Sequence, residues 1–315
     1  MPFDPTVNEG WSICKLHSIV PYGAASKTKN LSEEASSLSP YLRITMTLPQ
    51  SNYILPLQLG QPIHICGLDR NGNAIQAEFY PFHESGTSPS PSPGYFSLLV
   101  PNPTKHKTLD ASTVDLDETS NNDLQQRRVV QLLQDYQKTG DTEIAIHPGV
   151  TSKLQYHGKH YPGTEIVYLV IGSTGIVPIL EQARTVLRSS SSSETSTRRS
   201  GVERVSVVWI TGTIEEFDAL SDNLKQIYDQ YPTQLAVTCG VESNLQSSMT
   251  QEIAADYFFD NNMEINDTIP NFQPGMIAII SVEGVPPTSA SLLRKVATTY
   301  LQRQKQFPLD CMCVL

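Results

Sequence analysis

The residues best suited to chemistry are four small ones in a row, Gly172, Ser173, Thr174 and Gly175. They follow a nearly continuous apolar run at 166–171, which predicts a buried parallel strand, and they precede a predicted helix over about 177–187. Because these residues have little side-chain bulk, their backbone N–H groups can approach a phosphate or a flat ring near the positive end of the helix. The pattern predicts a ligand-binding turn. An ordinary strand–turn–helix unit, whose small residues serve only close packing, fits the motif equally well.

The elements around this turn change character along the chain. The first half alternates short strands with turn residues, which predicts a small antiparallel β-barrel, with one helix over about 124–137. The second half alternates strands with helices, which predicts an α/β domain with an open parallel sheet. We assign residues 1–160 to the barrel and 161–315 to the α/β domain. The expected strands are 11–19, 41–47, 62–68, 74–80, 95–100 and 142–146, then 166–171, 205–210, 235–239 and 276–282, and the later helices are about 177–187, 215–230 and 288–305.

Composition excludes several classes of function. The chain has 315 residues, 39% of them hydrophobic and 17% charged, which is ordinary for a folded two-domain protein. A formal net charge of −10 argues against general binding to nucleic acid or to an anionic membrane. No apolar run approaches the ~20 residues of a membrane span, and the first residues resemble neither a secretory signal nor a transit peptide.

The cysteines indicate a reducing compartment and no structural metal. They are odd in number and scattered, without a Cys-x-x-Cys pair or a Cys/His grouping of zinc-ligand spacing. His157 and His160 are not assigned to a metal, since the neighbouring Gly158 and Pro162 disfavour a helix. Polar stretches at 85–94, 104–126 and 189–201 are expected to be loops. The cysteines are Cys14, Cys66, Cys239, Cys311 and Cys313.

Taken in order, four segments resemble the ferredoxin–NADP reductase superfamily, and within it the NADH–cytochrome b5 reductase branch. Residues 172–178 (GSTGIVP) stand where that family has GGTGITP, and residues 205–218 resemble its second nucleotide-domain strand and the following loop. Residues 276–287 resemble the strand that leads into the family's CGPPPM, and residues 311–315 resemble its terminal strand. The resemblance covers roughly residues 40–315.

The resemblance implies a two-cofactor electron-transfer enzyme. In such proteins FAD lies on the barrel with its ring against a tyrosine, here Tyr80, and NADH binds the second domain. Hydride then passes to the flavin across the cleft between the domains, and single electrons leave to a haem or another acceptor. No catalytic residue and no metal ligand is assigned. The implied cofactor-binding residues are Phe79, Tyr80, Pro81, Leu99, Val100, Arg127, Arg128, Gly172, Ser173, Thr174, Gly175, Thr213, Glu283 and Gly284.

The chain departs from the family pattern on the flavin side. Glu78 replaces the arginine that neutralises the FAD phosphate, and a carboxylate there would repel a pyrophosphate. Pro81 replaces the hydroxyl residue that serves flavin N5, which removes both donors. Arg127 and Arg128, expected at a helix N-terminus where positive charge is unfavourable, are the favoured phosphate partners ahead of Lys105 and Lys107.

The nucleotide side also departs from the pattern. Glu283 replaces the cysteine near the hydride path. Residues 211–216 offer hydroxyls and the carboxylates of Glu215 and Glu216 but no arginine, which favours NADH over NADPH.

These observations predict an FAD-dependent oxidoreductase that passes electrons from NADH to a haem protein or a similar acceptor, in an intracellular location that is mitochondrial or cytoplasmic. The alternative is a cofactor-poor scaffold or assembly subunit that retains the reductase fold.

Overall fold

A computed structural model describes residues 11–23, 39–50, 62–82, 94–103, 118–140, 143–148, 164–191, 202–246, 267–285 and 287–314. The chain divides into two compact units, Met1–Ser152 and Lys153–Leu315. The expected domain boundary at 160/161 falls in a segment outside the described residues, so its exact place stays a prediction.

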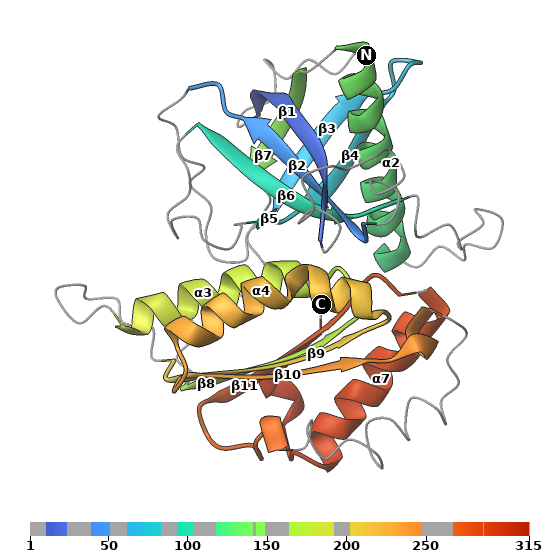
Figure 1. The fold of residues 1–315 in the computed structure, drawn as a ribbon. Helices are drawn as coiled ribbons and strands as arrows, with labels where there is room; N and C mark the ends of the chain where they lie inside the picture. Colours follow the sequence, from blue (N-terminus) through green and yellow to red (C-terminus); the bar gives the residue numbers. More distant parts are fainter. Residues whose placement is uncertain are drawn as a thin grey trace. The chain divides into compact units, whose positions relative to one another are not determined.

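Unit 1 is built on a seven-stranded antiparallel sheet with the strand order β4-β3-β7-β1-β2-β6-β5 (Figure 1). Tyr22 of β1 and Phe82 of β5 stack edge to face with ring centroids 5.4 Å apart, although two strands lie between them. A flat sheet would separate these strands by about 14 Å, so the sheet is strongly curled. The strands are β1 (Ser12–Tyr22), β2 (Tyr41–Thr47), β3 (Ile63–Leu68), β4 (Ala74–Phe79), β5 (Pro81–Phe82), β6 (Tyr95–Pro101) and β7 (Glu143–Pro148).

Strand alternation places one face of this sheet in the core of unit 1. Leu42, Ile44 and Met46 of β2 are buried on that face, and the strand residues between them point the other way. Helix α2 (Glu118–Thr139) adds Val129 and Leu133 to the same core. The predicted antiparallel first domain is therefore confirmed.

Helix α2 begins earlier than the sequence suggested. It starts at Glu118 rather than near residue 124, so the expectation of a loop through residue 126 is wrong for 118–126. The mean hydropathy there is low, and the apolar spacing becomes helical only from Val129 onward. The sequence pattern therefore predicts only the later part of the helix, which packs on the core.

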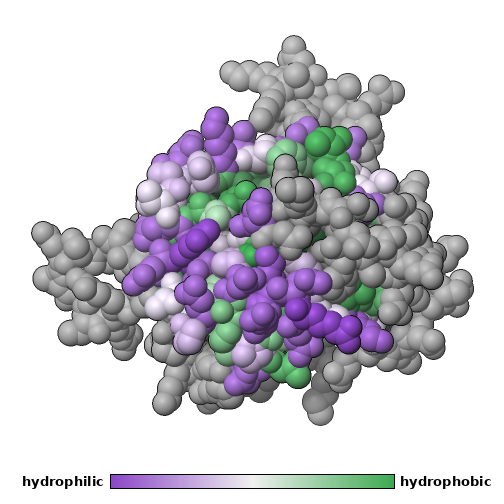
Figure 2. Space-filling view, turned by 90° about the horizontal axis from the view of Figure 1, so that it is seen from below, coloured by the Kyte–Doolittle hydropathy of each residue, from purple (hydrophilic) through white to green (hydrophobic). Residues whose placement is uncertain are grey.

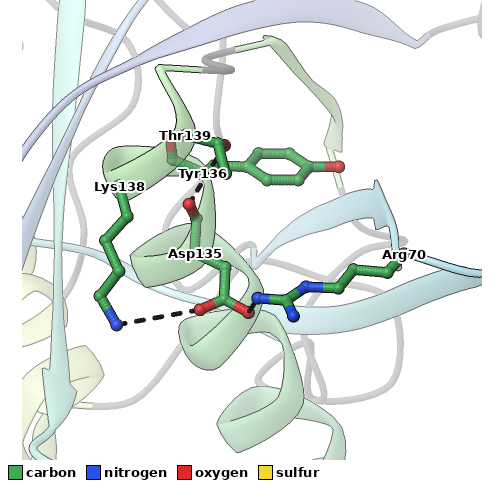
Figure 3. Close-up of polar contacts among 5 residues, drawn as sticks. All are labelled: Arg70, Asp135, Tyr136, Lys138 and Thr139. Atoms are coloured by element: carbon green, nitrogen blue, oxygen red, sulfur yellow. Dashed lines mark hydrogen bonds and ion pairs between the residues drawn. The ribbon is translucent and has the colours of Figure 1, made fainter.

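The other end of α2 is fastened to the β3–β4 hairpin (Figure 3). The Tyr136 hydroxyl donates to the Leu68 carbonyl at 2.8 Å and accepts from the Leu68 N–H at 3.1 Å. Arg70 pairs with Asp135 at 3.3 Å, but the Arg70 side chain is 85% exposed and the pair contributes less than about 1 kcal/mol. The tyrosine, rather than the ion pair, fixes the helix end.

We expect Tyr136→Phe to lower the free energy of unfolding of unit 1 by about 1–2 kcal/mol, because both polar groups of Leu68 lose a partner. Urea unfolding of the full chain, with hydrogen exchange of the β3–β4 peptides as the probe for unit 1, measures the change. Tyr95→Phe is the matched control, since Tyr95 is 50% exposed. Equal stabilities of the two variants would contradict this role for Tyr136.

Unit 2 is a five-stranded sheet, parallel throughout, with the order β10-β9-β8-β11-β12. Helices α3 and α4 cover one face and α7 covers the other (Figure 1), which explains why the central strands read as continuous apolar runs. The predicted α/β second domain is confirmed. Its elements are β8 (Glu165–Ile171), α3 (Ile176–Ser191), β9 (Arg204–Thr211), α4 (Ile214–Gln230), β10 (Leu235–Val241), η3 (Ser243–Gln246), β11 (Met276–Val282), α7 (Pro287–Arg303), η4 (Leu309–Cys311) and β12 (Met312–Val314).

The residues coloured in Figure 2 are mainly hydrophilic, with small apolar areas that are separate from one another. Within the described ranges, no helix has the length and apolar character needed to cross a membrane.

Candidate functional site

The strand order of unit 2 marks one point of its sheet as a crevice for ligands. From β8 the chain moves outward through β9 to β10 and then returns to place β11 on the other side of β8. In open α/β sheets, ligands bind outside the carboxyl ends of the strands at such a reversal. The turn at residues 172–175 follows β8, and residues 283–285 follow β11, so both predicted turns lie at this point.

The first of these turns requires glycine at its start. Gly172 has φ +101°, and a Cβ added there would overlap the Glu283 carbonyl oxygen. The Gly172 N–H donates to the Ile210 carbonyl at 2.8 Å, and the Gly172 carbonyl accepts from the Trp209 indole Nε1–H at 3.0 Å. One backbone and one side-chain hydrogen bond from β9 therefore fix the turn, and the Glu283 carbonyl after β11 leaves no room for a side chain.

The second turn meets the first directly. Gly284 has φ +76°, and a Cβ there would overlap the Ser173 hydroxyl and come within 3.1 Å of Thr174 Oγ1. The structure therefore brings together the predicted site residues Gly172, Ser173, Thr174, Glu283 and Gly284.

Two hydroxyls beneath the turns are buried without a hydrogen-bond partner in the part of the chain that is described, Thr174 Oγ1 and Ser281 Oγ. Ser281 lies so close to Gly175 that a side chain at 175 would overlap its oxygen. The N-terminus of α3 begins at the next residue, Ile176. Unpaired donors at a helix N-terminus suit a ligand with an anionic or carbonyl oxygen. The sequence did not single out Ser281, because one serine in an apolar strand gives no functional signal.

The turn between β9 and α4 is organised differently from the sequence expectation. Thr213 caps α4, its hydroxyl accepting from the Glu216 N–H at 3.3 Å. The Glu216 carboxylate points inward, where it accepts from Thr211 Oγ1 at 2.5 Å and from the Gly212 N–H at 3.2 Å. The expectation that Glu216 offers its carboxylate to a ribose is therefore wrong, since this side chain completes a capping box. Glu215 is exposed.

The predicted flavin residues of unit 1 occupy two environments. Phe79 and Val100 are buried in the core, so only their backbone could meet a ligand. Leu99 is also buried, and it points away from that core cluster. Tyr80 lies half-buried between β4 and β5, and Pro81 of β5 pairs with Leu98 of β6.

Glu78, predicted to stand where the resembled family has an arginine, lies close to a histidine within the sheet. Its carboxylate lies 3.5 Å from His64 Nε2, and the other ring nitrogen of His64 lies 3.2 Å from Gln76 Nε2. The Glu78 backbone carbonyl accepts from Gln126 of α2 at 2.6 Å. Sequence reasoning missed His64, because its pairing with Glu78 depends on the β3–β4 register.

Arg127 and Arg128 lie within α2 rather than at its start, since the helix begins at Glu118. The argument that a helix N-terminus gives them a phosphate partner is therefore wrong. Hydrogen bonds from Asn73 lower the pKa of Asp69, and the Arg128 charge adds to this effect, so Arg128 lies near the β3–β4 turn. Lys105 and Lys107 lie outside the described residues, as do His157 and His160.

None of the cysteines forms a disulfide. Burial raises the pKa of Cys14 to about 12 and that of Cys239 to about 11, so both thiols stay protonated at neutral pH. Over the described ranges, no group of three or more His, Cys, Asp or Glu side chains could hold a metal ion.

No protein-family model and no curated protein sequence matches the chain. Solved structures do match along nearly its whole length. The cytochrome b5 reductase domain of Ulva prolifera nitrate reductase superposes with a TM-score of 0.55 at 11% identity, over 100% of this chain and 99% of that one. The CS-b5R domains of human Ncb5or, in the NAD+ form, superpose with a TM-score of 0.54 at 14% identity, over 96% of this chain and 69% of that one. Plasmodium falciparum ferredoxin-NADP+ reductase superposes with a TM-score of 0.53 at 8% identity, over 97% of this chain and 95% of that one.

The predicted resemblance is thus confirmed as a likeness of fold: the chain folds like these reductase structures. The low identities fit a divergent sequence.

We expect Gly172→Ala to destabilise unit 2 by about 3 kcal/mol or more, because the methyl group adds a clash with the Glu283 carbonyl to the strain of positive φ. Gly140→Ala is the control, since Gly140 has φ +78° with nothing within 4 Å of an added Cβ. It should cost only about 1 kcal/mol. Urea unfolding of both variants measures the difference, and equal costs would contradict the close approach of the two turns.

A second prediction concerns the pH dependence of stability. Burial raises the pKa of the Glu216 carboxyl above its ordinary value of 4.5, so the folded state binds this proton more tightly than the unfolded chain does. The free energy of unfolding should therefore fall as the pH rises from about 4.5 through the raised folded-state pKa.

Glu216→Gln keeps an acceptor for Thr211 and Gly212 and should remove this part of the pH dependence. Chemical unfolding at a series of pH values measures the difference between wild type and variant. Glu215→Gln, at an exposed position, should leave the pH dependence unchanged. A wild type and Glu216→Gln with parallel pH profiles would refute the prediction.

Proposed function

We propose that the chain is an FAD-dependent oxidoreductase that takes electrons from NADH and passes them to a haem protein or a similar acceptor. The observation that carries this proposal is the meeting of two glycine turns at the sheet reversal, where Gly172 and Gly284 both have positive φ and each would clash if it had a side chain. Such close backbone approach, beside a helix N-terminus and the unpaired Thr174 hydroxyl, suits a dinucleotide.

The charges near α4 support NADH rather than NADPH. Residues 211–216 contain no arginine or lysine, and the exposed Glu215 carboxylate would repel a ribose 2′-phosphate. Thr213 remains the proposed ribose contact, because its hydroxyl can donate to a ligand while its oxygen caps the helix.

The barrel fits a flavin ring better than it fits a pyrophosphate. Tyr80 is half-buried and could stack on a ring, with Leu99 nearby in β6 as an apolar contact. Pro81 has no N–H to offer to flavin N5. Glu78 does not fit a phosphate site, since a carboxylate already paired with His64 would need to be displaced. When bound, FAD supplies the chemistry that converts a hydride into single electrons.

The same observations favour the second candidate, a scaffold that retains the reductase fold without FAD. The Glu78 carboxylate lies 3.5 Å from His64 and the Glu78 backbone carbonyl accepts from Gln126, so unit 1 has an arrangement around Glu78 that requires no phosphate.

The acceptor and the compartment are also proposals. We propose a haem protein as the acceptor, and the net charge of −10 would favour encounter with a positively charged one. We propose an intracellular location, mitochondrial or cytoplasmic, in keeping with cysteines that are all free.

We expect the purified full chain, after incubation with FAD, to show flavin absorbance that bleaches when NADH is added without oxygen. NADPH should act at least about tenfold more slowly. Tyr80→Ala should lower flavin occupancy at least about tenfold, since stacking of an aromatic side chain on a flat ring contributes on the order of 1–3 kcal/mol to binding.

Tyr95→Ala serves as the matched control, because Tyr95 is an exposed tyrosine of the same sheet. It should bind flavin as the wild type does. A colourless wild-type protein that takes up no FAD would support the scaffold and refute the enzyme.

A further inference from the structure

Trp209 is a buried aromatic residue whose polar atom acts on the nucleotide turn. Its side chain is 0% exposed in β9, and its indole Nε1–H donates to the Gly172 carbonyl at 3.0 Å. In β8 the residue paired with Trp209 is Val170, so the indole reaches past the end of β8 to contact the turn. Its ring also packs against Phe217 in the first part of α4, with centroids 6.1 Å apart.

The hydrogen bond from Trp209 to the Gly172 carbonyl also determines the direction in which the next backbone N–H points. A peptide group is planar and trans, so the carbonyl of one residue and the N–H of the next point in opposite directions. Because Trp209 holds the Gly172 carbonyl toward the β9 side, the N–H of Ser173 points away from β9. The Ser173 nitrogen accordingly lies on the side of Gly284, 3.2 Å from where a Cβ of Gly284 would stand.

Because residue 172 is a glycine, the orientation of the 172–173 peptide depends on contacts such as this hydrogen bond. Gly172 lacks a Cβ and can adopt many combinations of φ and ψ, so its own backbone does not fix the plane of the next peptide. Gly172 N–H is held by Ile210, but this bond constrains the preceding peptide. The indole is the side-chain donor that acts on the 172–173 peptide itself.

We propose that Trp209 is a positioning residue for the pyridine-nucleotide site: its indole N–H fixes the orientation of the Gly172–Ser173 peptide, and with it the shape of the turn that the nucleotide meets at the sheet reversal. This inference rests on the proposed function, since it names a residue that shapes the same site. A purely structural hydrogen bond would stabilise unit 2 without changing nucleotide affinity.

The test replaces Trp209 with Phe, which keeps a buried ring and removes only the donor. In Trp209→Phe, hydrogen exchange of the peptide that contains residues 172–175 should speed up about tenfold without ligand. The dissociation constant for NAD+, measured by calorimetry on the FAD-loaded full chain, should rise about tenfold, with the flavin content unchanged. In turnover with NADH, KM should rise while kcat changes little.

Tyr300→Phe is the control, because Tyr300 is equally buried in unit 2 and lies on α7, away from the turn. It removes a polar atom from a core aromatic residue and should change neither the exchange nor the affinity. A folded Trp209→Phe with wild-type exchange and wild-type NAD+ affinity would overturn the proposal.

A measurement on the wild-type chain keeps the proposal testable if Trp209→Phe does not fold. The sequence has only two tryptophans, Trp11 and Trp209, so their indole N–H resonances can be assigned with Trp11→Phe. Titration with NAD+ should shift the Trp209 indole resonance and leave that of Trp11 in place. Saturation without a shift at Trp209 would overturn the proposal.

Failure of the proposed function gives a different result. A wild type that binds no NAD+ would refute the pyridine-nucleotide site and, with it, the role of Trp209 in binding. Faster exchange at residues 172–175 in Trp209→Phe would still show that the indole orders the turn.

Discussion

Unit 2 depends on the direct contact between two backbone turns at the reversal of its sheet. Gly172 lies against the Glu283 carbonyl, and Gly284 lies against Ser173. Neither approach is compatible with a Cβ, and both glycines have φ values that other residues rarely adopt. Because β8 and β11 are adjacent and parallel in register, their ends must meet at this place whatever the side chains are. The sheet therefore creates the contact, and the glycines make it possible.

The features that the sequence could predict are those that a local pattern determines. A six-residue apolar run before Gly172 is enough to indicate a buried strand and a tight turn. The features it could not predict depend on pairing between distant residues. Glu78 finds His64 only through the β3–β4 register, and Trp209 is indistinguishable from the other apolar residues of its strand until its indole is seen to reach Gly172.

The start of α2 and the role of Glu216 differ from the sequence predictions for two separate reasons. The first turns of α2 carry polar residues that give no apolar spacing, so the sequence predicts a later start and puts Arg127 and Arg128 at a helix end that they do not occupy. Thr-x-x-Glu before an apolar stretch is compatible with a ligand contact or with a capping box, so the sequence alone does not show that Glu216 points inward. The hydrogen bonds that Thr211 and Gly212 donate to the Glu216 carboxylate show that this side chain caps the start of α4.

The two units differ in how far their sequences depart from the reductase pattern that they resemble, and the kind of ligand contact proposed for each unit explains the difference. In unit 2 the proposed ligand contacts are mostly backbone groups, whose position requires glycine at 172 and 284, so substitutions there would disrupt the fold itself. In unit 1 the proposed contacts are side chains on an already stable sheet, which accommodates Glu78 with its carboxylate 3.5 Å from His64. A chain can therefore lose side-chain contacts to a phosphate while retaining the backbone geometry that suits a nucleotide. This asymmetry makes flavin occupancy, rather than nucleotide binding, the property that separates an active reductase from a scaffold with the same fold.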